Sequence, residues 1–192
     1  MPKAKISLVL DTSILISALK SRDEAKSPAW LILNCLKSDL LQNHVPDGIL
    51  DEMKFTLALI ALKYESKLGH SIHKRAHDIF RIIKTHSKKV TSKVDFSKEK
   101  TIKEKLKDED DLKFLEILYT VKAKFLITRN TKHFGNFVIE KDKKTGKGKK
   151  TGKARLKQHY FYVLTDSQFK KHLQTNYPKE TEKCRKRRAK KS

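Results

Sequence analysis

The chain has 192 residues, of which 45 are basic and 22 acidic, so its formal net charge is +23 at pH 7, and 38% of its residues are hydrophobic. This length predicts one compact domain with an appendage, and the charge indicates a polyanionic partner, chiefly nucleic acid. An anionic membrane surface is the other candidate, but no strongly amphipathic basic helix supports it, and no apolar stretch approaches the length of a transmembrane helix.

The first half of the chain alternates short apolar runs, which predict buried strands, with apolar residues at helical spacing. Ser27 and Pro28 suit an N-cap followed by proline at the first helical position. The expected elements are a strand at 6–10, a helix at 28–37, a strand at 40–45, a helix from 46 onward, a helix at 71–86 and a short strand at 90–94.

The second half continues the alternation after a charged stretch. Residues 95–109 are expected to be irregular, and a helix is expected to start at Asp110 or Asp111 and to run to about Val121. A strand at 123–128, a last strand at 159–164 and a last helix from Asp166 follow. Strands that alternate with helices predict the α/β class, with helices on both faces of a mainly parallel central sheet.

Two strongly basic segments do not fit the core pattern. Residues 140–157 hold nine basic and two acidic side chains, a net of +7, and residues 176–192 hold eight and two, a net of +6. Such segments are expected to be solvated unless they bind something anionic. We therefore predict one domain over residues 1–175, with a basic hairpin or loop insertion at 140–157, and a disordered basic tail at 176–192.

The two cysteines indicate a reducing compartment. Cys35 lies in an apolar run and is expected to be a buried thiol, whereas Cys184 lies in the basic tail, so the pair does not make a secreted disulfide framework. Lys3 and Lys5 before an apolar run resemble a signal peptide, but Asp11 interrupts that run. A cytoplasmic protein is the expectation.

Several acids stand where helices begin, and each has a structural explanation. Asp11 directly follows the first strand, at the sheet edge where functional crevices form, but it could equally cap the next helix. Glu52 lies early in a helix, where the helix dipole favours an acid. The run from Asp108 to Asp111 could likewise cap the helix that follows it.

The order of these motifs is more specific than any one of them, and it resembles the PIN domain. The resemblance covers roughly residues 5–138 and the final strand, and it implies a PIN-like three-layer α/β/α sandwich. One further segment, S-P-A-W-L-I-L at 27–33, is similar to the branch that contains VapC-like (PilT N-terminus-like) toxins. The matching motifs are L-V-L-D-T-S-I-L-I-S-A-L at 8–19, P-D-G-I-L-D-E-M at 46–53, D-D-L-K-F-L-E-I-L at 110–118 and F-L-I-T-R-N-T-K-H-F at 125–134.

The resemblance implies a set of site residues. Asp11 and Glu52 match the first two metal-binding acids, and Asp111 or Asp110 matches the third, with spacing in favour of Asp111. The supporting polar residues would be Thr12, Ser13 and Thr128. Asn130 stands where many family members have aspartate, so the fourth ligand could be Asn130, His133, water or nothing.

These residue types suit one kind of chemistry. Carboxylates that converge in one cleft repel one another unless a cation joins them, and oxygen ligands suit Mg²⁺ or Mn²⁺. Such an ion activates water, and the expected product ends are a 5′-phosphate and a 3′-hydroxyl. RNA would be held against this acidic site by the basic residues that flank the motifs, namely Lys20, Arg22, Arg129 and Lys132.

The sequence thus predicts a metal-dependent endoribonuclease. The resemblance implies the toxin of a toxin–antitoxin pair, a homodimer that a cognate antitoxin masks. The alternative is a catalytically weak or inactive PIN-fold protein that binds RNA within an RNA-processing assembly, which Asn130 and the basic segments favour. A nuclease directed at DNA is a weaker third hypothesis. His70, His73 and His77 share a helix face, but nothing nearby completes a zinc site.

Overall fold

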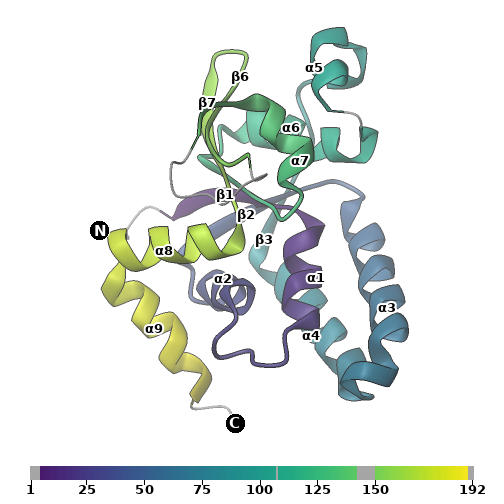
Figure 1. Ribbon diagram of the computed structural model, residues 1–192, viewed down its shortest axis with the longest axis vertical. Helices are drawn as coiled ribbons and strands as arrows, with labels where there is room; N and C mark the ends of the chain where they lie inside the picture. The colour runs from purple at the N-terminus through teal and green to yellow at the C-terminus, as the bar shows by residue number, and fades with distance from the viewer. Residues whose placement is uncertain (1–4, 107, 142–149, 190–192) are drawn as a thin grey trace.

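The computed structural model describes residues 5–106, 108–141 and 150–189 (Figure 1). A mixed sheet of seven strands runs through this part of the chain in the order β3-β2-β1-β4-β7-β6-β5. The strands are β1 (Ile6–Leu10), β2 (Leu41–Pro46), β3 (Ser87–Val90), β4 (Phe125–Ile127), β5 (Val138–Lys141), β6 (Gly152–Leu156) and β7 (His159–Leu164).

The larger part of the sheet is parallel, as predicted. Strands β3, β2, β1, β4 and β7 pair in parallel, while β6 pairs antiparallel with β7 and β5 antiparallel with β6. Leu10 pairs with Ile127, and Ile127 pairs with Leu164, so β1, β4 and β7 end side by side. Any polar residue that follows one of these strands therefore lies at a common edge of the sheet.

Helices cover both faces of the sheet, which gives the three-layer α/β/α sandwich (Figure 1). Helix α6 packs on β1 and β2 from one face, whereas α2 and α8 pack on β2 and β7 from the other, beside α1. The helices are α1 (Thr12–Lys20), α2 (Pro28–Lys37), α3 (Ile49–Leu68), α4 (Ser71–His86), α5 (Lys100–Lys105), α6 (Glu109–Val121), α7 (Thr131–Phe134), α8 (Asp166–Asn176) and α9 (Pro178–Ala189), with 3₁₀ turns η1 (Phe96–Lys98) and η2 (Gly135–Phe137).

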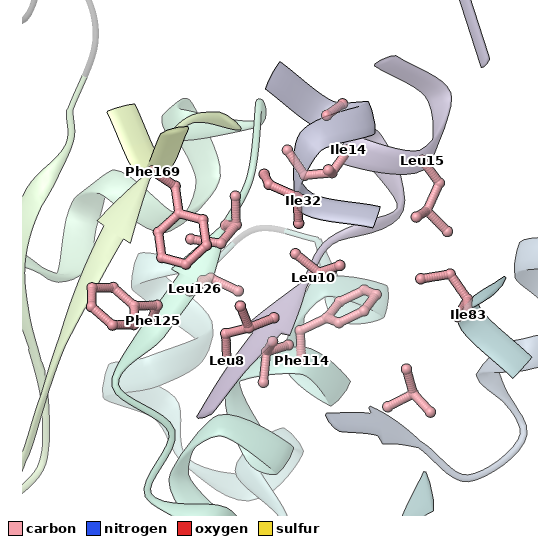
Figure 2. Close-up of a cluster of buried hydrophobic side chains, with 14 of the residues drawn as sticks. Leu8, Leu10, Ile14, Leu15, Ile32, Ile83, Phe114, Phe125, Leu126 and Phe169 are labelled. Atoms are coloured by element: carbon pink, nitrogen blue, oxygen red, sulfur yellow. The ribbon is translucent and has the colours of Figure 1, made fainter. Parts of the chain in front are cut away.

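The sheet is buried between these helices. Leu8, Leu10 and Leu126 are fully buried, because strands covered on both faces carry apolar side chains in succession. Figure 2 shows them between Phe114 of α6 and Phe169 of α8. Truncating one such leucine to alanine costs about 2–5 kcal/mol. No helix among the described residues is long and apolar enough to cross a membrane.

The third strand lies earlier in the chain than predicted. The expected strand at 90–94 is wrong, because β3 covers Ser87–Val90. Its backbone pairs in parallel with β2, and the buried Asn43 adds a side-chain contact: it accepts a hydrogen bond from the Leu10 N–H and donates to Ser87 Oγ at 2.9 Å. The stretch expected to be irregular also contains η1 and α5, whose Phe96 and Ile102 are buried.

The C-terminal segment is helical rather than disordered. Helix α9 packs against α2 and α8, with Thr181 and Cys184 buried. Thr181 Oγ1 donates to the Leu173 carbonyl at 3.2 Å. The prediction of a disordered tail is therefore wrong for Pro178–Ala189. The many charged residues of this segment obscured the buried positions Thr181 and Cys184. Of the basic insertion, residues 142–149 lie outside the described part of the chain, and the flanking residues form β5 and β6.

Candidate active site

Asp11 connects the end of β1 to the start of α1. Its carboxylate accepts hydrogen bonds from the Ser13 N–H at 3.1 Å, from Ser13 Oγ at 2.7 Å and from Thr128 Oγ1. The residue is 6% exposed, so these donors replace the water that a buried carboxylate would otherwise lose. Asp11 thus caps α1 and at the same time stands at the carboxyl edge of the sheet, and the two interpretations of it are compatible.

The segment after β4 is tied to Asp11 through its backbone. The Arg129 N–H donates to Ser13 Oγ at 3.0 Å, and the Asn130 N–H donates to Thr128 Oγ1 at 2.8 Å. Thr128 is fully buried. Ser13 and Thr128 therefore hydrogen-bond to Asp11, whereas Thr12 is the first residue of α1 and makes none of the hydrogen bonds found to Asp11 among the described residues.

Asp111 lies in the first turn of α6, where His133 of α7 meets it. His133 Nδ1 is 2.7 Å from Asp111 Oδ2 and 3.9 Å from Asp108 Oδ2, and the Asn130 amide lies 2.7 Å from the same nitrogen. The pKa of Asp111 is raised to about 6, chiefly by burial; the His133 hydrogen bond opposes the shift, and the charges of Asp11 and Asp108 add to it. The two buried carboxylates are therefore close enough for the charge of Asp11 to raise the pKa of Asp111.

Two of the predicted acids lie to one side of this cluster. Glu52 Oε2 is 3.9 Å from Lys113 Nζ, and Asp110 Oδ1 is 3.5 Å from the same amine. The Asp110 side chain is 74% exposed, so the structure distinguishes the two neighbouring aspartates: Asp111 turns inward and Asp110 turns to solvent. Lys113 forms ion pairs with Glu52 and Asp110, whereas Asp111 interacts with His133 and with the charges of Asp11 and Asp108.

The donor set of this cluster fits a divalent cation. Asp108, Asp111 and His133 each offer a possible ligand atom, and these atoms all lie within 4.8 Å of one another. Carboxylate oxygens prefer hard cations such as Mg²⁺ and Mn²⁺, and Mn²⁺ also accepts imidazole. The raised pKa of Asp111 is the sign expected of a carboxyl group that lacks a compensating positive charge.

A basic cavity of about 440 Å³ lies next to Asp11. Arg129 reaches it from the end of β4, and its Nε is 3.3 Å from both oxygens of Asp166, which is 1% exposed and follows the last strand. Ser17 Oγ also donates to Asp166 at 3.2 Å. The buried carboxylate thus fixes a half-exposed guanidinium at the cavity wall, which is lined by Ser13, Ile16, Ser17, Lys20, Ser21, Ser27, Pro28 and Arg129.

The remaining basic residues predicted to contact nucleic acid are distributed around this cavity. Lys20 lines it while lying 4.2 Å from the centre of the Tyr64 ring. Arg22 is exposed in the loop that follows α1, and Lys132 is exposed on α7 beside His133. Two of the four, Lys20 and Arg129, are therefore brought together at one cavity.

Two residues of the site were not proposed from the sequence. Asp108 was interpreted only as part of a helix cap; it does accept from the Asp110 N–H at 3.1 Å, but it also faces His133. Asp166 was interpreted as the start of the last helix. The sequence contained a signal for this residue: Asp166 comes two positions after the end of β7, and Asp11 comes directly after the end of β1.

Comparison with known proteins gives one match. A family model described as the PIN domain matches residues 7–132, which begin within β1 and end within α7. The matched span contains Asp11, Glu52, Asp111, Thr128 and Asn130. No curated protein and no solved structure matches the chain.

Proposed function

The chain belongs to the PIN-domain family, and from this membership we propose that it is a metal-dependent endoribonuclease. Family membership supports a nuclease or RNA-related function. The finer proposal is supported by Asp11 and Asp111, two buried carboxylates close enough for the charge of Asp11 to raise the pKa of Asp111, in a chain with a net charge of +23. The positive charge of the protein attracts RNA, and the two acids require a cation to offset their mutual repulsion.

Asp11 and Asp111 would hold Mg²⁺ or Mn²⁺, with Asp108 and Glu52 as further carboxylates. Bound there, the ion would activate water and offset charge on the phosphodiester. Ser13 and Thr128 fix the orientation of Asp11, and His133 fixes that of Asp111. Hydrogen bonds of this kind orient metal ligands in proteins.

The nuclease is tested by cleavage of labelled RNA with Mg²⁺ or Mn²⁺ and with EDTA. Asp11→Asn should lower the cleavage rate by more than about 100-fold, because losing residues that merely orient a ligand costs about 10–100-fold. Asp51→Asn, at an exposed acid of α3, is the matched control and should cleave like the wild type. Cleavage that persists in EDTA or in Asp11→Asn would contradict the proposal.

The cavity beside Asp11 would take the RNA strand that flanks the cut, with Arg129 on a phosphate. Asp166→Asn is expected to release Arg129, because it removes the buried charge that holds Nε. We expect KM to rise several-fold with kcat nearly unchanged, since the lost interaction is one of binding. Steady-state kinetics measure this, and a loss confined to kcat would argue against the phosphate role.

Asn130 favours a second candidate function, a PIN-fold protein that binds RNA with weak or no cleavage in an RNA-processing assembly. Where an aspartate would add a charge, the Asn130 amide contributes none and instead contacts His133. Tight, salt-sensitive RNA binding without cleavage in the experiment above would select this candidate.

The proposal extends to a cytoplasmic toxin of a toxin–antitoxin pair that forms a homodimer and is masked by an antitoxin. Support for the dimer comes from α3, whose Phe55, Leu59 and Leu62 are exposed. This helix carries three acidic and three basic residues, so two copies could approach along it without the repulsion expected elsewhere on the chain. Light scattering of Leu59→Lys should report a monomer where the wild type is a dimer; equal masses would refute this interface.

A further inference from the structure

The outer face of the antiparallel hairpin carries an exposed pair of tyrosines. Tyr162 pairs with Lys153 across β6 and β7, and Tyr160 pairs with Arg155, so all four side chains lie on one face of the sheet. Tyr160 is 50% exposed and Tyr162 39% exposed. The intervening Phe161 and its partner Ala154 are buried on the opposite face. We call these four residues (Tyr160, Tyr162, Lys153 and Arg155) the tyrosine face.

Part of the tyrosine face is packed against the rest of the fold, and part of it is exposed to solvent. Tyr162 stacks on Phe125 with ring centroids 5.8 Å apart, and Phe125 in turn meets Phe169 of α8. Helix α8 thus covers the C-terminal part of β7, while the hairpin extends past it (Figure 1). Tyr160 lies beyond this cover, and Lys153 is 5.4 Å from the centre of its ring. A large aromatic ring left half in water on a strand is available to a ligand.

A cavity of about 490 Å³ separates the tyrosine face from α8. Its size lies in the range of about 300–1,000 Å³ that is usual for small-ligand sites. Gln168 and Asn176 of α8 add polar groups to its wall. The residues of the lining that offer a ring or a positive charge are Lys124, Phe125, Lys141, Lys153, Tyr162 and His172.

The charges around this surface select an anionic ligand. Four basic residues, Lys124, Lys141, Lys153 and Arg155, meet one acid, Glu140, which pairs with Lys153 at 3.0 Å. Phosphates spaced along a nucleic-acid backbone match such a group of cations. Exposed rings add a second requirement, because a ring can stack only on a base that is not already paired within a duplex.

We propose that the tyrosine face and its cavity bind a single-stranded segment of RNA, with bases stacked on Tyr160 and Tyr162 and phosphates at Lys153 and Arg155. The surface is separate from the acids that would hold the metal, so binding there requires neither metal nor cleavage. The proposal rests on the proposed function only in taking RNA as the substrate, for which this surface would supply a second point of attachment.

Fluorescence anisotropy in EDTA tests the proposal, with labelled single-stranded RNA and a duplex of equal length. Every protein carries Asp11→Asn, so that the RNA stays intact. Tyr160→Leu should weaken single-strand binding about tenfold, which is the loss expected for one stacked base. Tyr160→Phe keeps the ring and should bind like the parent. Arg155→Gln should reduce the slope of log K against log salt by about 0.7, and Arg81→Gln, at an exposed arginine of α4, should not.

The outcomes separate this proposal from the nuclease. Equal single-strand affinity for Tyr160→Leu and the parent, with equal melting temperatures, would overturn it, and so would equal losses for single strand and duplex. Weakened binding by Tyr160→Leu with restoration by Tyr160→Phe supports it, even if the wild type cleaves no RNA. Conversely, a wild type that cleaves RNA while Tyr160→Leu binds normally would leave the nuclease standing and refute the tyrosine face.

Discussion

At the scale of single residues, the electrostatics of the site concentrate on Asp111. Its carboxyl group is buried, and its pKa of about 6 lies well above the ordinary 3.8, first because of burial and then because of Asp11 and Asp108. The folded, metal-free protein therefore holds the proton of Asp111 more tightly than the unfolded chain does, and ionisation of Asp111 costs stability. A residue retained despite such a cost is a common mark of a functional site.

Asp111→Asn should stabilise the metal-free protein while abolishing cleavage. The folded pKa lies above the unfolded value, so Asp111 reduces stability fully above about pH 6 and not at all well below pH 3.8. The variant should therefore gain about 1–3 kcal/mol at pH 8, given 1.36 kcal/mol per pKa unit as an upper guide. Urea unfolding in EDTA at pH 8 and pH 4 measures this gain. A variant that is less stable than the wild type at pH 8 would show that the carboxylate stabilises the fold.

At the scale of elements, the segments that bear the acids follow from local sequence. The apolar run at Ile6–Leu10 predicts β1, because a strand buried on both faces is apolar throughout, whereas β7 is predicted by its aromatic and β-branched residues. Strand β3 has no such signal, since its sequence Ser-Lys-Lys-Val is not apolar: Lys88 and Lys89 are exposed, and the strand is held by its pairing with β2 and by the hydrogen bond from Asn43 to Ser87. Helix α9 is equally difficult to predict, because among its residues of described burial the buried positions are Thr181 and Cys184, which lie between charged residues.

The site was predictable to the same extent. Asp11, Ser13 and Thr128 could be predicted because each lies in a short polar motif just after a strand. The roles of Asp108 and His133 depend on how α6 and α7 meet, and the ion pair between Glu52 and Lys113 depends on how α3 approaches α6. Contacts between elements far apart in the chain leave no periodic trace in the sequence, so the resemblance could name candidates but not their contacts.

Removal of residues 178–192 should expose Cys35. Cys184 of α9 contacts Cys35 of α2, and this contact together with burial raises the pKa of the Cys35 thiol. A protonated, buried thiol reacts slowly, so the full chain should resist a maleimide in native buffer. The truncated chain should react at Cys35 within minutes and melt several degrees lower. Mass spectrometry follows the labelling. Equal protection of Cys35 in both chains would mean that α9 does not cover it.

At the scale of the whole molecule, the fold combines an acidic centre with basic surroundings. Asp11 and Asp111 are buried close to each other, and the cavity with Arg129 and Lys20 is lined by Ser13, which hydrogen-bonds to Asp11. The tyrosine face adds two further basic residues, Lys153 and Arg155 of β6. RNA held by these surfaces would be brought against carboxylates that repel it, and a divalent ion is the component that reconciles the two charges.

That ion is the central claim, and electron paramagnetic resonance of Mn²⁺ during titration tests it most directly. We expect the wild type to bind Mn²⁺, and we expect Asp11→Asn and Asp111→Asn each to weaken binding by more than about tenfold, since each removes one proposed ligand. Asp51→Asn, which changes an exposed acid of α3, should bind like the wild type. Wild-type affinity in both Asp11→Asn and Asp111→Asn would contradict the account, because the metal would then be held elsewhere or not at all.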